Sequence, residues 1–102
     1  MRADVSLPVV WTQDGTHLLP GSLELSGTTL RLSGGSRERE ERRELDLADI
    51  ASTHLARSGS ERVGGRMTLV IELRAGGWIR VAGFERPGSL IELADRLHHV
   101  RG

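Results

Sequence analysis

Hydrophobic and polar residues alternate in two neighbouring segments near the C-terminus. From Met67 to Arg74 every second residue is apolar, which is the period of a strand with one buried face. The glycines of residues 75–77 suit a tight reversal, and residues 78–82 then form the returning segment. This pattern predicts a β-hairpin.

Residues 87–100 have the different period of an amphipathic helix. The apolar stripe that we expect to be buried consists of Leu90, Leu93, Ala94 and Leu97, widened by Ile91. Pro87 suits the first helical position, where its missing N–H costs nothing. Alternatively, Ser89 and Glu92 form a capping box and the helix begins two residues later. The chain therefore closes with one helix.

Shorter alternating segments predict five further strands before the hairpin. They lie near residues 5–12, 17–25, 29–32, 43–47 and 50–57. Because Pro8 has no N–H to donate to a ladder, we expect its segment at a sheet edge or at a bulge. Two polar stretches, residues 33–44 and 58–66, are predicted to be flexible loops. The first holds eight consecutive charged residues and offers no apolar face.

Composition favours one small β-rich domain covering residues 1–102. The chain has 3% aromatic residues, so its core must consist mainly of Leu, Val and Ile. Its 13 glycines suit a protein with many turns, and the absence of cysteine excludes disulfides and thiolate metal sites. No apolar run reaches the length of a membrane span, and the N-terminus lacks a signal-peptide pattern. We expect a cytoplasmic protein.

Charge gives little guidance to a partner. The 14 basic residues are all arginine and are balanced by 14 acidic residues. The two signs are interspersed, so we expect no nucleic-acid binding. A coding bias explains the arginines most simply; an arginine surface selected for phosphate or carboxylate contacts is the alternative.

Catalytic and metal-binding motifs are not evident. Adjacent His98 and His99 point about 100° apart on a helix, and Asp95 with His99 supplies two metal ligands at most. The serines lie in Gly/Ser stretches without a nucleophile elbow, and no glycine cluster has the strand–loop–helix context of a phosphate loop. We expect no enzyme, no metal and no cofactor.

Three patterns resemble the pleckstrin-homology-like (PH-like) barrel of the bacterial or GRAM type. They are residues 21–32 as the opening hairpin, residues 45–50 as a middle-strand step, and residues 69–97 as the closing hairpin and helix. The resemblance covers residues 17–100. It implies a mainly β fold with about seven antiparallel strands in a partly open barrel capped by the C-terminal helix. The loop at residues 26–29 carries no cation, so phosphoinositide binding is not expected.

The resemblance implies a non-catalytic protein-interaction or self-assembly module. Related barrels bind a peptide by strand addition beside the helix, and the candidate edges here are residues 51–57 or the Pro8 segment. The candidate partner-binding residues are Trp78, Arg57, Arg62 and Arg66. Because Trp78 alternates with Ile79 and Val81, we expect it on the less buried face of its strand. The alternative is a peripheral membrane- or anionic-ligand-binding domain that uses the arginine-bearing loops 37–43 and 57–66.

Overall fold

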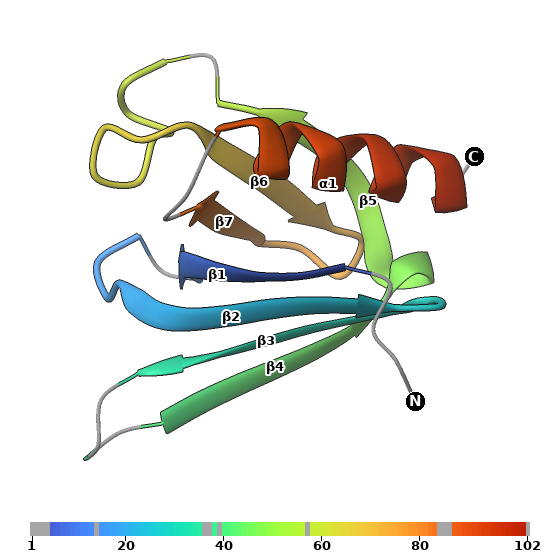
Figure 1. Cartoon of the computed structure of the whole chain (residues 1–102), viewed down its shortest axis with the longest axis horizontal. Coiled ribbons are helices and arrows are strands. Elements are labelled where there is room, and N and C mark those ends of the chain that lie inside the picture. Colours follow the sequence, from blue (N-terminus) through green and yellow to red (C-terminus); the bar gives the residue numbers. More distant parts are fainter. Residues whose placement is uncertain are drawn as a thin grey trace.

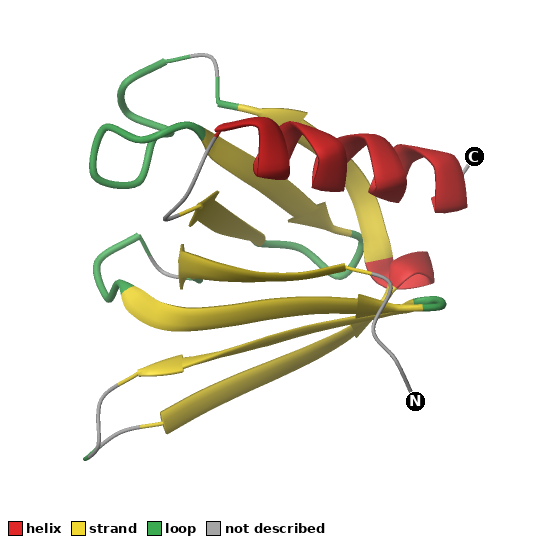
Figure 2. Ribbon diagram, in the orientation of Figure 1, coloured by secondary structure: helices red, strands yellow, loops and turns green. Residues whose placement is uncertain are grey.

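Seven strands precede a single helix along the chain (Figures 1 and 2). The computed structural model describes residues 5–13, 15–35, 38, 40–56, 58–83 and 87–101, except for the side chains of residues 87–89 and 98–101. The elements are β1 (Val5–Thr12), β2 (Leu19–Ser26), β3 (Thr29–Gly35), β4 (Glu40–Asp46), the short 3-10 helix η1 (Leu47–Asp49), β5 (Ile50–Leu55), β6 (Thr68–Leu73), β7 (Trp78–Gly83) and α1 (Pro87–Arg101). The helix begins at Pro87, as one of the two alternatives predicted.

All seven strands belong to one antiparallel sheet of order β4-β3-β2-β1-β7-β6-β5. The sheet curls into a half-barrel, and α1 crosses its open side (Figure 1). Because β4 and β5 are consecutive in the chain but terminal in the sheet, the chain passes from one end of the curled sheet to the other through η1. The mainly β architecture with one C-terminal helix confirms the predicted fold class.

The core lies between the concave face of the sheet and α1. It is aliphatic apart from Trp11, as the composition predicted, and its largest fully buried members are Trp11, Leu23, Leu25, Leu30, Leu32, Ile50, Leu69, Ile71, Ile79, Leu90, Leu93 and Leu97. The helix packs on β5, β6, β7 and η1. Two expectations were wrong: Ile91 is 47% exposed and Met67, which precedes β6, is 38% exposed.

The charged segment 33–44 is not a loop over most of its length. Residues 33–35 complete β3, and residues 40–44 form most of β4. The register pairs Arg31 with Glu44 and Gly35 with Glu40, so β4 is held by its ladder to β3, and Leu45 anchors it in the core. Backbone pairing with a neighbouring strand thus outweighs the missing apolar face. By contrast, residues 58–66 contain turns and bends but no helix or strand, so here the prediction of a loop is confirmed.

Pro8 lies in a strand with two different halves. Residues 9–12 of β1 pair with both β2 and β7, so the expectation of an edge strand is wrong for this half of β1. Residues 5–8 pair only with β2 among the described strands. Pro8 therefore occupies the half of β1 where a missing N–H costs least.

Candidate functional site

The terminal strand β5 presents unpaired backbone groups. The Ala56 amide donates to the Thr68 carbonyl at 2.8 Å, and this pair continues the register Leu55↔Leu69. Hydrogen-bonded pairs alternate along an antiparallel ladder. The backbone groups of Ala56 and His54 therefore point toward β6, whereas those of Thr53 and Leu55 point toward the open side of β5. The structure thus has a polar backbone edge at residues 53 and 55.

Side chains around this edge are small or uncharged. Residues 50–56 contain no acidic residue and no arginine. Thr53 and Leu55 are half-buried, and Leu55 packs against the core cluster. The neighbouring helix adds the partly buried Ala94 and the exposed Ile91, three residues apart and so on one flank of α1. An extended segment beside β5 would meet the outward backbone groups of residues 53 and 55 and the half-buried Leu55.

The β5–β6 connection is folded against the outer face of strands β5 to β7. His54 Nε2 lies 2.9 Å from Glu61 Oε2, and both side chains are less than one-third exposed. Val63 is 5% exposed, and its amide donates to the buried Thr68 hydroxyl at 2.8 Å. These contacts fix residues 60–63 against the sheet and leave the backbone edge of β5 uncovered by them.

Trp78 lies where this connection meets the β1–β2 loop. The Arg80 guanidinium stacks over the indole at 3.9 Å from the ring centroid, and Arg80 Nη1 donates to the Ser60 carbonyl at 3.0 Å. A Cβ at Gly15 would lie 3.3 Å from Trp78 Cη2, so this glycine lies against the ring. Trp78 is half-buried, on the face opposite to the buried Ile79 and Val81, as its alternation predicted.

The predicted site residues are only partly brought together. Arg62 and Arg66 are exposed on the β5–β6 connection, and Arg66 Nη1 lies 3.4 Å from the Gly83 carbonyl. Trp78 is linked to the same connection through Arg80. Arg57 lies outside the described residues. The role of all four in binding stays a prediction.

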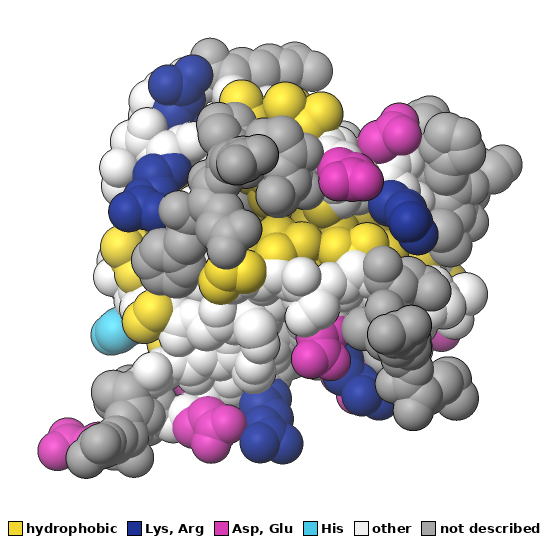
Figure 3. Space-filling model, viewed as in Figure 1, with side chains coloured by type: hydrophobic (Ala, Val, Ile, Leu, Met, Phe, Trp, Pro, Cys, Tyr) yellow, Lys and Arg dark blue, Asp and Glu magenta, His cyan; other side chains and the backbone are white. Residues whose placement is uncertain are grey.

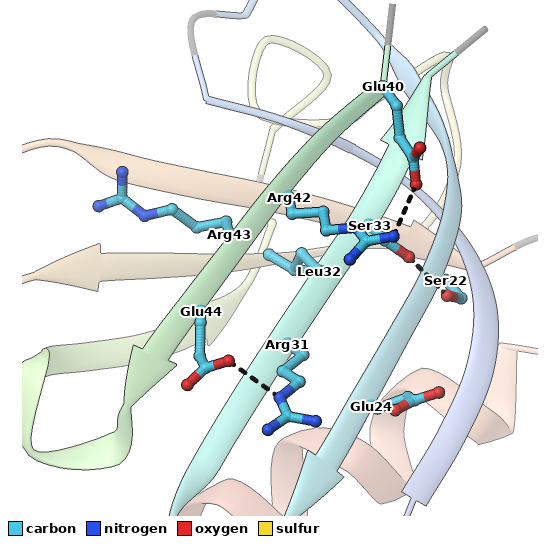
Figure 4. A pocket seen from close by; sticks show the side chains of 9 residues that line it. All are labelled: Ser22, Glu24, Arg31, Leu32, Ser33, Glu40, Arg42, Arg43 and Glu44. Carbon is cyan, nitrogen blue, oxygen red and sulfur yellow. Dashed lines mark hydrogen bonds and ion pairs between the residues drawn. The ribbon is translucent and has the colours of Figure 1, made fainter. Parts of the chain in front are cut away.

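The opposite terminal strand, β4, presents a charged surface. A depression of about 400 Å³ on β2, β3 and β4 is lined by Ser22, Glu24, Arg31, Leu32, Ser33, Glu40, Arg42, Arg43 and Glu44 (Figure 4). Arg31 pairs with Glu44 at 3.0 Å and Arg42 with Glu40 at 3.2 Å, each with side chains more than 60% exposed. Arg43 points away from the other charged groups (Figure 4). Exposed pairs of this kind contribute little to stability or to selectivity.

Several kinds of site are missing from the described part of the chain. Within it, no group of three or more His, Asp or Glu side chains is placed to hold a metal ion. No described helix has the length and hydropathy needed to cross a bilayer. The face seen in Figure 3 shows hydrophobic side chains between α1 and the strands below, with scattered charges of both signs. Asp95 lies in α1, but the side chains of His98 and His99 are not described.

The fold and these edges define a class: a seven-strand antiparallel half-barrel with a C-terminal helix. A crystal structure of the C-terminal domain of an unknown protein from Leishmania infantum has the same architecture, with a TM-score of 0.72 and 13% sequence identity. The match covers 94% of this chain and 84% of that one. No protein-family model and no curated protein matches the sequence. At this identity the likeness concerns the fold alone.

Proposed function

We propose that the chain is a PH-like, non-catalytic interaction module that binds an extended segment along β5, beside α1. The observation that carries the proposal is the backbone of Thr53 and Leu55, which points away from β6 at the end of the sheet. Strand addition satisfies such groups through main-chain hydrogen bonds, and pockets for alternate side chains add selectivity. The strand order followed by a C-terminal helix supports the PH-like part of the proposal.

Side-chain chemistry beside the edge favours apolar residues in the bound segment. Alternate residues of an added strand would lie over the concave side, where Leu55 is partly buried against the core and α1 packs on β5. The remaining residues would lie on the outer side, near Ser52 and His54. Ser52 already donates to Glu72 at 2.9 Å and His54 is paired with Glu61, so these groups add little charge to the edge.

The experiment is a selection from a displayed library of random linear peptides, followed by NMR mapping. We expect selected peptides to shift and protect the Thr53 and Leu55 amides, with further shifts in α1. The variant Thr53→Pro removes an N–H that points away from β6, so it blocks strand addition while leaving the β5–β6 ladder intact. Gly59→Ala, in a turn with open space around it, is the matched control that should bind normally.

Two results together would contradict this function. One is a selection that yields no peptide mapping to β5. The other is that the Thr53 and Leu55 amides exchange with solvent equally fast at every protein concentration. Neither a foreign strand nor a second copy would then be adding to the edge.

A second candidate, a peripheral membrane- or anionic-ligand-binding domain, is favoured by two exposed arginines. Arg62 and Arg66 both lie on the β5–β6 connection, at the left of Figure 1, and both are exposed. Co-sedimentation with anionic vesicles at low and physiological salt tests it. Electrostatic docking predicts binding that weakens steeply with salt and is reduced in Arg62→Ala, Arg66→Ala. The absence of binding at low salt would exclude it.

A further inference from the structure

We infer that the segment that adds to β5 is a second copy of this chain, paired antiparallel about a two-fold axis centred on Thr53. This inference rests on the proposed function and names its partner. The supporting observation is a difference between β4 and β5. Pairing of β4 with β4 of a second copy opposes like charges, whereas the same pairing of β5 does not.

A two-fold axis imposes a simple rule on paired edge strands. Directly opposed residues of an antiparallel pair lie on the same face. Since the two strands are identical, every such register places one residue opposite its own copy. The residue one position before the centre is then opposed to the residue one position after it, and the same holds for the residues two positions before and after. The charges of the central residue and of these neighbours decide whether the register is repulsive.

On the β4 edge, every self-paired register considered places like charges opposite each other. Each residue from Glu40 to Glu44 is charged, so centring on any of them opposes a like-charge pair. Centring on Leu45 instead opposes Glu44 to Asp46, which is again a like-charge pair. Like charges directly opposite one another destabilise a β-pair. The β4 edge is thereby protected against pairing with itself.

On the β5 edge, a register centred on Thr53 opposes no like charges. Thr53 then faces Thr53 of the second copy, a favourable cross-strand pair, and its outward amide and carbonyl exchange two hydrogen bonds. Ser52 is opposed to His54, so no like charges meet. Leu55 of each copy lies near Ala51 of the other, where an irregularity shifts the register of β5 against β6. The helix flank with the exposed Ile91 lies on an element that packs against β5 in each copy.

The two edges together predict a closed dimer. Pairing through β5 uses one edge of each copy and leaves β4 as the outer edge on both sides of a continuous sheet. Because β4 opposes its own pairing, growth stops at two copies. A chain with two permissive edges would instead form open polymers.

The test is the solution mass of the intact chain, measured by light scattering over a wide concentration range. We expect the mass to rise from 11.2 kDa to twice that value and to remain there. Thr53→Pro should be monomeric throughout. Ala51→Lys, which places a cation near the apolar Leu55 of the second copy, should raise the concentration needed for dimerisation at least tenfold. Ala48→Lys adds the same charge at an exposed position in η1 and should dimerise like the unsubstituted chain.

Circular dichroism establishes that each variant is folded, and Ala51→Lys, whose side chain is exposed, decides the question if Thr53→Pro does not fold. A chain that is monomeric at all concentrations overturns the inference, as does a dimer that Ala51→Lys leaves unchanged or a mass above two copies. If the chain is monomeric but a selected peptide protects the Thr53 amide, the inference that the partner is a second copy is wrong, and the proposed function is supported. If neither occurs, both are wrong.

Discussion

The two terminal strands of the sheet, β4 and β5, differ in the charge and the packing of their residues. Both have one side without a partner strand among the described residues. Strand β4 carries five consecutive charged residues, whereas β5 carries no acidic residue or arginine and packs against α1. Charged edges resist the addition of a further strand, and uncharged ones permit it. Of the two terminal strands, therefore, only β5 has an edge that permits the addition of a further strand.

The two halves of the sheet are also held together differently. On the β4 side, β2 and β3 approach closely at Gly21 and Gly34, and the buried Trp11 covers them, with Nε1 donating to the Ser33 carbonyl at 3.0 Å. On the β5 side, α1 inserts Leu90, Leu93 and Leu97 into the concave face. The stability of the β4 side therefore depends on the close approach of two backbones, and that of the β5 side depends on the packing of the helix. Each dependence is testable by substitution.

The largest effect is expected at Gly21. A Cβ added there would overlap the Ser33 carbonyl oxygen of the paired strand, so the β2–β3 ladder must open to accept Gly21→Ala. We expect a loss of more than about 4 kcal/mol in the free energy of unfolding, measured by urea denaturation with tryptophan fluorescence. Gly59→Ala has nothing within 4 Å of its added carbon and is the matched control. Equal stabilities of the two variants would show that the strands are not in close approach.

A somewhat smaller effect is expected for Leu93→Ala on the helix side. Leu93 is fully buried, so truncation leaves a cavity beneath α1 and should cost about 3 kcal/mol in the same assay. Ile91→Ala, two residues away on the exposed flank, should change the stability of the monomer by about 0.5 kcal/mol or less. If the two variants were equally destabilising, α1 would not pack in the orientation described.

Sequence periodicity predicted the parts of the fold that bury an apolar face. The β6–β7 hairpin and the stripe on α1 belong to this group, because burial of every second residue, or of every third and fourth, leaves a direct trace in the sequence. Strand β4 leaves almost none, since only Leu45 enters the core and the remaining residues are held by backbone bonds to β3. The order of strands, and with it the interior place of β1, depends on long-range pairing that no local pattern records.

The candidate site was less predictable than the fold. Residues 51–57 were considered as an edge, but the outward direction of the Thr53 and Leu55 backbone follows only from the register with β6. Trp78 was singled out as a tryptophan on the less buried face, yet its partner Arg80 is defined by spatial stacking. Val63 is buried in a segment without periodicity, so nothing in the sequence indicated that the β5–β6 connection is folded against the sheet.

On the β5 side, the His54–Glu61 pair offers a test of that connection. A double-mutant cycle with His54→Ala and Glu61→Ala should give a coupling energy of about 1 kcal/mol near neutral pH, because the hydrogen bond is partly shielded from water. Both single variants should also increase proteolytic cleavage within residues 58–66. If the coupling is zero and cleavage is unchanged, the contact does not hold the connection in place.

The smallest effect is expected for the corresponding pair on the β4 side. Arg31 and Glu44 are directly opposed on β3 and β4, but their side chains are 62% and 64% exposed. A cycle with Arg31→Ala and Glu44→Ala should give a coupling of about 0.3 kcal/mol that disappears at high salt, because solvent and ions screen exposed charges. A coupling as large as that of the His54–Glu61 pair would contradict the view of β4 as a solvated, protective edge. It would instead mean that the charges along β4 hold the strand in its register.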